Sequence, residues 1–396
     1  MQNILSLNNF NLSYAGYDLS CFDPYNPLNL PPNTMRLLFT DAYTPTSQST
    51  ATFTQISQSP NIWDVTRENG DWEGLFRANR KLLAVLGANT TNVTAIDSTF
   101  SGCENLSSVS LFDTRNVAVM NGTFSNCSNL SSIPLFDTHN VLVMNSTFSN
   151  CTNLSSIPLF DTRNVVAMAS TFSNCTNLSS IPTFNTTNVR SFRWTFTDCS
   201  NLSSIPLFDT THLVDMEGTF SGCSSLSSIP LFDTINVTSM RETFTNCKNL
   251  VSVPLFDTTN VKSMYRTFFA CDNLSSIPSF DTHNVTNMFS IFYDCKNLSS
   301  IPLFDTTNLT TMDFAFGNCT SLSAIPSTYS SYVSNLTSME AAFKNCYNVE
   351  TGISALYQLV SSNITDYWGY HQTFKNCGIN TTQGAAELAM IPDDWK

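Results

Sequence analysis

Cysteine is the residue type whose spacing most directly raises the question of chemistry. Cysteines recur every 24 residues, as Cys103, Cys127, Cys151, Cys175, Cys199, Cys223, Cys247, Cys271, Cys295 and Cys319, and they continue irregularly as Cys346 and Cys377, with Cys21 apart. A zinc site needs converging ligand pairs such as Cys-x-x-Cys, and the sequence has no such pair. Because regular recurrence indicates one structural position, we expect buried thiols that pack as small apolar groups. Disulfides between neighbouring cysteines are the alternative.

Aspartate follows the same period. The column consists of Asp113, Asp137, Asp161, Asp209, Asp233, Asp257, Asp281 and Asp305, with Asn185 substituting once. Carboxylates in such a series could bind bridging calcium. Each could instead accept backbone N–H bonds in a turn, which asparagine does equally well. The Asn185 substitution favours turn capping, and we expect no metal site.

Histidine offers no further chemistry. His139, His212 and His283 stand at or beside one variable turn position, and His371 is near the C-terminus. No serine or cysteine is placed with a histidine and an acid in a recognised catalytic motif, and no glycine-rich phosphate loop occurs. We therefore expect a protein that is not an enzyme and that uses no cofactor.

These residues must be positioned by a repeat that reads C-x-x-L-S-S-I-P-L-F-D-T-x-N-V-x-x-M-x-x-T-F-x-x-C. Leu130, Ile133 and Leu135 have the L-x-x-L-x-L spacing of a leucine-rich-repeat strand. From Val141 to Cys151 the apolar residues step by three, four and three, which predicts one face of a short helix. Proline follows the Ile in most units and cannot donate to a strand ladder, so each strand should end at or near that Ile.

A single unit cannot bury its own apolar side, so the units must stack. The sequence therefore predicts an α/β repeat fold, a leucine-rich-repeat solenoid of about 12 or 13 coils over residues 72–346, each with a short strand and a short helix. The array begins near Trp72, which stands where other units have methionine, and Asn79 replaces the first cysteine of the column.

The ends of the chain depart from the repeat. Residues 1–71 contain predicted strands at 35–40 and 52–56, and we expect an N-terminal β cap there. A three-residue insertion lies within 327–337. Residues 347–396 should form an irregular last coil and a C-terminal helical cap, with predicted helices at 352–360 and 384–390.

Composition excludes several classes of partner. The net charge of −13 and the absence of any basic run argue against nucleic-acid binding. No stretch is long and apolar enough to predict membrane insertion. Charged residues make up 12% of the chain, and Ser, Thr and Asn fill the polar positions instead, which suits exposure outside a cell.

The recurring F-D-T-x-N-V-x-x-M-x-x-x-F-x-x-C-x-x-L motif resembles the BspA-like leucine-rich repeat surface proteins over roughly residues 72–377. The resemblance implies adhesive modules of bacterial surfaces, with similar arrays in bacteriophage proteins. Residues 59–65 look like the caps on arrays in gut bacteria and their phages. Relatives on cells usually carry a signal peptide and an anchor, neither of which is visible here.

Variation between coils identifies a candidate binding patch. Positions that are small or polar in early coils become cationic or aromatic later, as Arg190, Arg193, Trp194, Arg241, Tyr265, Arg266, Phe269, Phe289, Tyr293 and Phe314. Arginine and aromatic side chains are enriched in binding hot spots. The alternative is that they only fill irregular packing between coils.

Taken together, the sequence favours a non-catalytic binding or structural protein. We expect a bacteriophage virion component, for receptor binding, fibre association or capsid decoration, that contacts other virion proteins or a host-surface protein or glycan and that could form a homo-oligomer. A BspA-like adhesin at the bacterial cell surface is the alternative.

Overall fold

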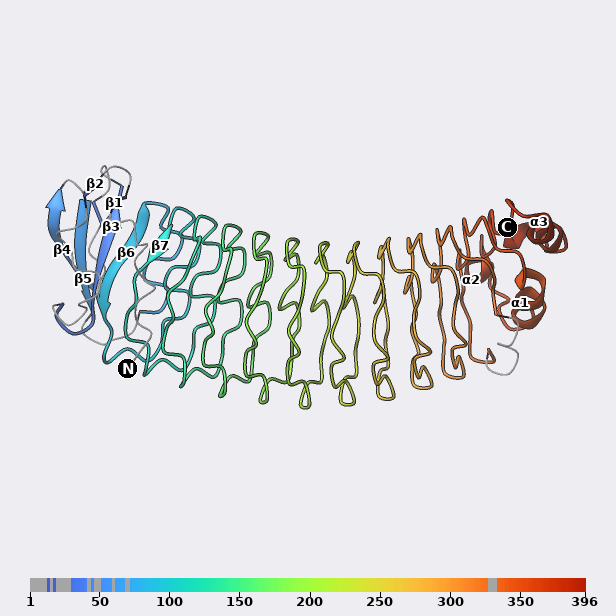
Figure 1. The fold of residues 1–396 in the computed structure, drawn as a ribbon, viewed down its shortest axis with the longest axis horizontal. Helices are drawn as coiled ribbons and strands as arrows, with labels where there is room; N and C mark the ends of the chain where they lie inside the picture. The colour runs from blue at the N-terminus through green and yellow to red at the C-terminus, as the bar shows by residue number, and fades with distance from the viewer. Residues whose placement is uncertain are drawn as a thin grey trace.

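The protein is a row of stacked coils, gently curved along its length (Figure 1). The computed structural model describes residues 13–14, 17–18, 30–40, 44–45, 51–58, 61–67, 72–326 and 333–396. Cys21, residues 59–60 and the part of the insertion at 327–332 lie outside the described residues.

A five-stranded sheet stands at the end of the row that is coloured blue (Figure 1). Its strands are β3 (Thr34–Phe39), β4 (Ala51–Gln58), β5 (Asn61–Arg67), β6 (Leu82–Asn89) and β7 (Ser108–Val109). The order is β4-β5-β3-β6-β7, and only β6 and β7 are parallel. The strands predicted at 35–40 and 52–56 are confirmed as β3 and β4. Two short strands, β1 (Ser13–Tyr14) and β2 (Tyr17–Asp18), pair with each other.

Strand β6 joins this sheet to the coils. It comes from the first predicted coil, yet it pairs antiparallel with β3 on one side and parallel with β7 on the other. Trp72 of the same coil is fully buried and lies beside Phe76, whose ring stacks on Phe100 of the next coil. The predicted register of the first coil is confirmed. The boundary at residue 71 and the role of the sheet as a cap stay predictions.

Proline explains why the sheet ends at β7. In this coil Ser110 takes the place of the proline, and its N–H donates to the Val85 carbonyl at 2.9 Å. In later coils Pro134 and its equivalents have no N–H to donate. Over residues 110–326, all of them described, no coil forms a strand, so the strand predicted for each coil is wrong beyond the first two coils, which contain β6 and β7. Successive coils instead pair through isolated parallel bridges, such as Val119 with Val143.

The short helix predicted in each coil is also wrong. Between Val141 and Cys151 the chain makes consecutive tight turns, and the described stretch 72–326 contains no α-helix. The N–H groups of Ser146, Phe148 and Asn150 donate to carbonyls of the next coil at 2.7–2.9 Å. Ser146 and Asn150 have φ values of 53° and 60°, and left-handed residues four apart cannot continue a right-handed helix.

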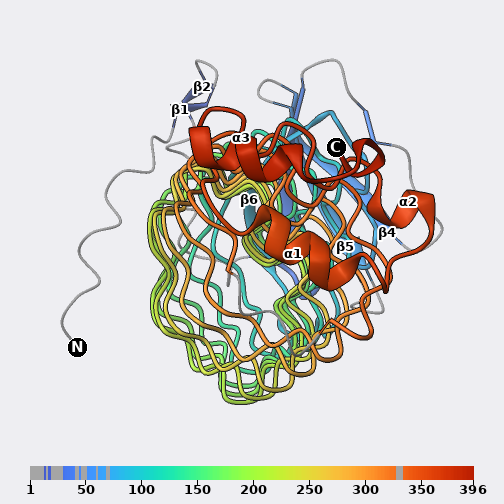
Figure 2. The same cartoon turned by 90° about the vertical axis from the view of Figure 1, so that its right-hand side faces the viewer.

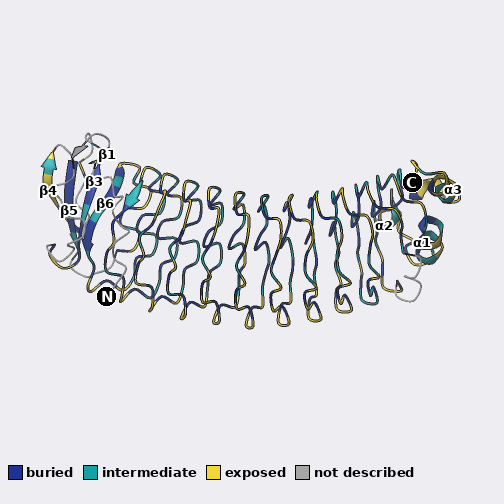
Figure 3. Ribbon diagram, viewed as in Figure 1, coloured by how far each residue is buried: buried dark blue, intermediate teal, exposed yellow. Residues whose placement is uncertain are grey.

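The apolar side chains of these turns are nevertheless buried as expected. Phe148 and Cys151 are fully buried. Figure 3 shows buried segments, in dark blue, recurring along the row of coils. Leu135 is an exception, because it is 58% exposed while its neighbour Phe136 is buried. The Phe136 N–H donates to the Pro134 carbonyl at 2.9 Å, which is a three-residue turn centred on Leu135. This turn points Leu135 outward and corrects its predicted place in the core.

Helices lie at the far end of the row, where Figure 2 shows α1 and α3 across the last coils. The elements are α1 (Ile353–Val360), α2 (Tyr367–Tyr370), α3 (Thr382–Ala389) and the 3-10 turn η3 (Asp393–Trp395). The helices predicted at 352–360 and 384–390 are confirmed as α1 and α3. None of the helices in the described residues is long and apolar enough to cross a membrane.

Candidate binding surface

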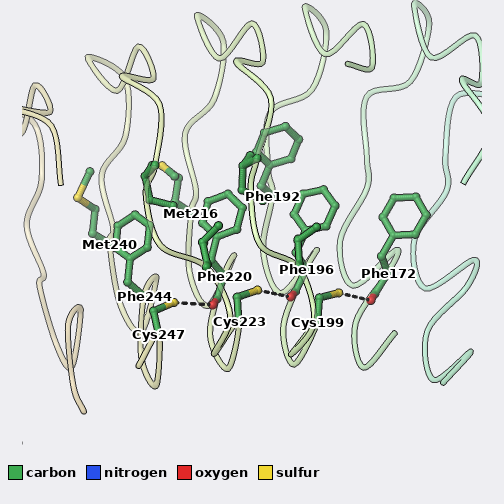
Figure 4. Close-up of a cluster of buried hydrophobic side chains, with 14 of the residues drawn as sticks. Phe172, Phe192, Phe196, Cys199, Met216, Phe220, Cys223, Met240, Phe244 and Cys247 are labelled. Atoms are coloured by element: carbon green, nitrogen blue, oxygen red, sulfur yellow. Dashed lines mark hydrogen bonds between the residues drawn. The ribbon is translucent and has the colours of Figure 1, made fainter. Parts of the chain in front are cut away.

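The cysteine column is a structural support for the surface. From Cys103 to Cys346, each thiol donates to the carbonyl of a phenylalanine in the preceding coil, as Cys223 does to Phe196 and Cys247 to Phe220 at 3.1 Å (Figure 4). Burial raises the pKa of Cys175 from its ordinary 9.0 to about 12. All twelve described cysteines are buried and free of disulfides, which confirms the expectation for them.

The aspartate column caps turns, as predicted. The Asp257 Oδ1 accepts the N–H of Thr259 at 3.0 Å, and the Asn185 Oδ1 accepts the N–H of Thr187 at 3.2 Å. The amide thus replaces the carboxylate without changing the turn. Within the part of the chain that is described, no group of three or more His, Cys, Asp or Glu side chains is placed to hold a metal ion.

Histidines serve the same turns. His139 Nδ1 lies 2.6 Å from Asp137 Oδ1, and this hydrogen bond lowers the pKa of the Asp137 carboxyl below its ordinary value. In most coils an asparagine Nδ2 donates to a carbonyl of the preceding coil, and His212 Nδ1 takes that place beside the Thr187 carbonyl at 3.0 Å. His212 is therefore part of an inter-coil ladder, which sequence reasoning did not foresee.

Five residues form a continuous row across successive coils, each directly after the position that methionine occupies in most coils. They are Arg193, Glu217, Arg241, Tyr265 and Phe289. Arg193 pairs with Glu217 at 3.3 Å, and Glu217 lies 3.7 Å from Arg241. The Arg241 guanidinium carbon lies 4.3 Å from the centre of the Tyr265 ring. Tyr265 stacks on Phe289 with ring centres 5.2 Å apart. Glu217 is the member that sequence reasoning missed, although its position in the 24-residue register would have indicated it.

A second stack lies beside this row. Phe269 and Tyr293 are parallel with ring centres 5.4 Å apart, and Phe314 meets Tyr293 edge-on at 6.3 Å. Phe314 also contacts Phe289, so the two stacks join. We call Arg241, Tyr265, Arg266, Phe269, Phe289, Tyr293 and Phe314 the Arg–aromatic cluster.

Arg266 is the centre of the Arg–aromatic cluster. Its guanidinium carbon lies 5.1 Å from the centre of Phe269, 5.3 Å from Tyr265 and 5.8 Å from Phe289. Its Nε is buried and finds no hydrogen-bond partner among the described residues. The aromatic faces attract the cation, while the buried Nε is left without an acceptor within the part of the chain that is described.

Trp194 lies one coil before Gly218. A Cβ built at Gly218 would overlap the six-membered part of the Trp194 indole, so the ring rests directly on the glycine backbone. Tyr293 lies in the same way over Gly317, where a Cβ would come within 2.8 Å of the ring. In both places the aromatic ring occupies the space next to the following coil that a side chain would fill if that coil had no glycine there.

The backbone holds three of the predicted patch residues in an unfavourable conformation. Trp194, Arg266 and Phe314 have φ values of 55°, 50° and 56°. Early coils place Gly122 or Ser146 at the same position. The left-handed conformation recurs at this position along the array, as in Ser170 and Glu242, and it is less favourable for bulky side chains than for glycine. Trp194, Arg266 and Phe314 therefore stand at a position whose backbone conformation favours glycine.

The predicted patch is thus largely brought together. Seven of its ten residues form the Arg–aromatic cluster, and Arg193 joins them through Glu217. Trp194 lies in the coil of Arg193 on the same turn. Arg190 is exposed on the preceding segment, where its N–H donates to the Val166 carbonyl, and no contact joins its side chain to the cluster within the described residues. Whether the patch binds a ligand stays a prediction.

Sequence reasoning missed an exposed apolar column. We call it the leucine column, and its side chains are 51–62% exposed: Leu111, Leu135, Leu159, Leu207, Leu231, Leu255 and Leu303. Thr183 and Ser279 occupy the two remaining positions of the register. The Pro-Leu-Phe triplet is the sequence signal that could have indicated this column. In that triplet a three-residue turn points the leucine outward and places the phenylalanine in the core, whatever the leucine spacing suggests.

The sequence matches a described family. The profile of the family called "Mycoplasma protein of unknown function, DUF285" matches residues 70–180, 124–231, 214–330 and 238–356. These overlapping matches cover residues 70–356, well over half of the chain. The chain belongs to the DUF285 family. No curated protein matches it.

Solved structures similar to this DUF285 protein include two leucine-rich-repeat proteins. One from Eubacterium ventriosum is 14% identical, with a TM-score of 0.31 and 78% and 95% of the two chains covered. One from T. pallidum is 16% identical, with a TM-score of 0.23, covering 64% of this chain and 91% of that one. The functional domain of InlJ from Listeria monocytogenes, which includes a cysteine ladder, is 11% identical, with a TM-score of 0.25 and 68% and 58% covered. The DUF285 matches confirm that the array belongs to a known family, and its link to bacteriophage arrays stays a prediction.

Proposed function

We propose that this DUF285 protein is a non-catalytic binding protein whose Arg–aromatic cluster contacts a protein or glycan partner. One observation carries the proposal: the half-buried Arg266 side chain stands among three aromatic rings on a left-handed backbone. Half-buried aromatic rings supply contact area at low entropic cost, and arginine supplies directed donors. The coils hold these groups in fixed positions, and the sheet and the C-terminal helices would close the two ends of the array.

Binding is tested with purified protein on a glycan array and on an array of host surface proteins. We expect at least one class of spot to bind the wild-type chain and to lose at least tenfold of that binding in Arg266→Gly. Ser146→Gly is the matched control, because Ser146 holds the same backbone position, at φ 53°, in a coil without the cluster. Equal binding by wild type and Arg266→Gly would contradict the assignment of the site.

We propose further that the chain works in a bacteriophage virion, on a fibre, at the receptor-binding end or on the capsid. The support is the resemblance of the repeats to arrays in phage proteins and the surface of Ser, Thr and Asn with few charges. A cell-surface adhesin of the BspA-like type is the second candidate, supported by the same repeats.

Mass spectrometry of gradient-purified phage particles, set against envelope fractions of the host, separates the two locations. Recovery at a constant copy number per particle is the result we expect. Recovery in envelopes with none in particles would contradict the virion proposal and favour the adhesin.

A further inference from the structure

The leucine column is a larger apolar surface than a monomer of this kind needs. Seven leucines that are 51–62% exposed present about 700 Å² of apolar surface in one column. A single apolar patch on a monomer usually covers about 300–600 Å². Core packing does not account for the column, because Phe136 and its equivalents fill the interior beside it.

We propose that the leucine column is the interface of an antiparallel homodimer, with a two-fold axis at Leu207. A stable dimer buries about 800 Å² per partner, which the column and the partly exposed prolines beside it can supply. This proposal is independent of the Arg–aromatic cluster.

The order of residues in the column selects the register. Eight 24-residue steps separate Leu111 from Leu303, and Leu207 stands midway between them. Antiparallel pairing about Leu207 brings Leu111 opposite Leu303 and Leu159 opposite Leu255 in the partner copy. Thr183 and Ser279 each then face a leucine instead of each other. A shift by one coil moves either Leu111 or Leu303 past the end of the partner's leucine column, so only the Leu207 register keeps all seven leucines opposite positions of that column.

Charge favours the antiparallel arrangement. Leu135, Asp137 and His139 alternate with buried residues, so the outward face carries the turn positions beside the leucine column. At the last of these positions the early coils carry Arg115 and Arg163, which pair with Asp113 and Asp161 of their own turns while their side chains stay 64–66% exposed.

The late coils offer the complementary charge. They carry Asp257 and Asp305 followed by threonines, with no arginine at that turn position. A two-fold axis across the row would set Arg163 opposite Asp257 and Arg115 opposite Asp305. Parallel pairing would place like coils together and lose this match. The arrangement offsets part of the repulsion between two chains of net charge −13.

The first test is the mass in solution, by analytical ultracentrifugation of the full chain from about 1 to 100 μM. We expect a dimer that Leu207→Asp converts to a monomer, because the two introduced carboxylates would meet at the axis. Leu142→Asp is the matched control, since Leu142 is 46% exposed on a different column and should leave the dimer intact. A monomeric wild type over the whole range would overturn the proposal, as would a folded Leu207→Asp variant that stays dimeric.

The register is tested by crosslinking with a short bis-maleimide in a Cys21→Ser background. The buried cysteines should not react, so an introduced thiol reports its own position. Leu207→Cys should crosslink to itself, and Leu111→Cys should crosslink only when mixed with Leu303→Cys. Crosslinking of Leu111→Cys to itself would indicate parallel pairing and refute the antiparallel register.

Discussion

The guanidinium of Arg241 rests on the face of Tyr265, 4.3 Å from the ring centre and one coil further along the array. Arg241 also lies 3.7 Å from Glu217 in the coil before. A cation that contacts both neighbouring coils couples the ion-paired part of the row to its aromatic part. Exposed ion pairs contribute only about 0–1 kcal/mol, so the stacked rings should dominate the stability of this surface.

Arg266→Gly should separate function from stability. Glycine relieves a left-handed residue, which is worth about 1–2 kcal/mol, while the lost contacts with three rings cost about 0.5–1 kcal/mol each. The free energy of unfolding should therefore change by less than about 1 kcal/mol, as measured by urea denaturation. Ser146→Gly should be neutral or stabilising. A loss above about 2 kcal/mol in Arg266→Gly would mean that Arg266 is mainly a packing residue.

Gly218→Ala should displace the Trp194 indole. The added Cβ overlaps the ring, so the variant should lose about 1–3 kcal/mol beyond the cost of a left-handed alanine, and tryptophan fluorescence should shift to the red. Gly122→Ala is the control for backbone cost, because Gly122 has φ 58° and its Cβ would meet Ser98 Oγ at 3.3 Å and Ser125 Cβ at 3.9 Å, with no ring in the way. In a Trp194→Gly background, Gly218→Ala should cost no more than Gly122→Ala. An undiminished cost in that background would exclude the contact as its cause.

Alkaline pH should destabilise the array through the cysteine column. Burial raises the pKa of Cys103, Cys175 and Cys346 from 9.0 to about 12, so these thiols stay neutral in the folded chain while unfolded thiols ionise above pH 9. A raised folded pKa contributes stability that is complete below pH 9 and is lost as pH rises towards 12. In that window, each of these thiols should lower the free energy of unfolding by about 1.4 kcal/mol for every unit that the pH rises.

Urea midpoints at pH 7, 8 and 10 measure this effect. We expect little change between the first two values and a steep fall at pH 10. At pH 8, the buried thiols should react with iodoacetamide only after unfolding. Rapid modification of the folded chain at several cysteines would contradict the burial argument.

Asp233 should be replaceable by asparagine but not by alanine. Its Oδ1 accepts the Ile235 N–H at 3.1 Å, the bond that Asn185 makes in another coil. Asp233→Asn should change the free energy of unfolding by less than about 0.5 kcal/mol, and Asp233→Ala should cost about 1 kcal/mol. Thermal melts with and without calcium complete the measurement. A calcium-dependent rise in Tm that Asp233→Asn abolishes would favour a metal site over turn capping.

The sequence predicted the architecture because each column repeats one physical requirement many times. Val141, Met144, Phe148 and Cys151 are buried as their spacing indicated, and the Asn185 substitution correctly identified the aspartates as turn caps. The strands β3 and β4 and the helices α1 and α3 also follow from local patterns. These features depend on which side chains are apolar and how they are spaced, and both properties are visible along the chain.

Only the tertiary structure decided how the backbone reaches those positions. Apolar steps of three and four are equally compatible with a helix and with turns, and the choice depended on N–H groups such as that of Phe148, which bond to the next coil instead of their own. In the same way Leu135 points outward because a turn at Pro134 admits Phe136 to the core. Likewise, Arg241, Tyr265 and Phe289 contact one another in one row only because the coils that carry them stack side by side. Residues 24 apart in sequence become neighbours through inter-coil hydrogen bonds, which no local pattern can specify.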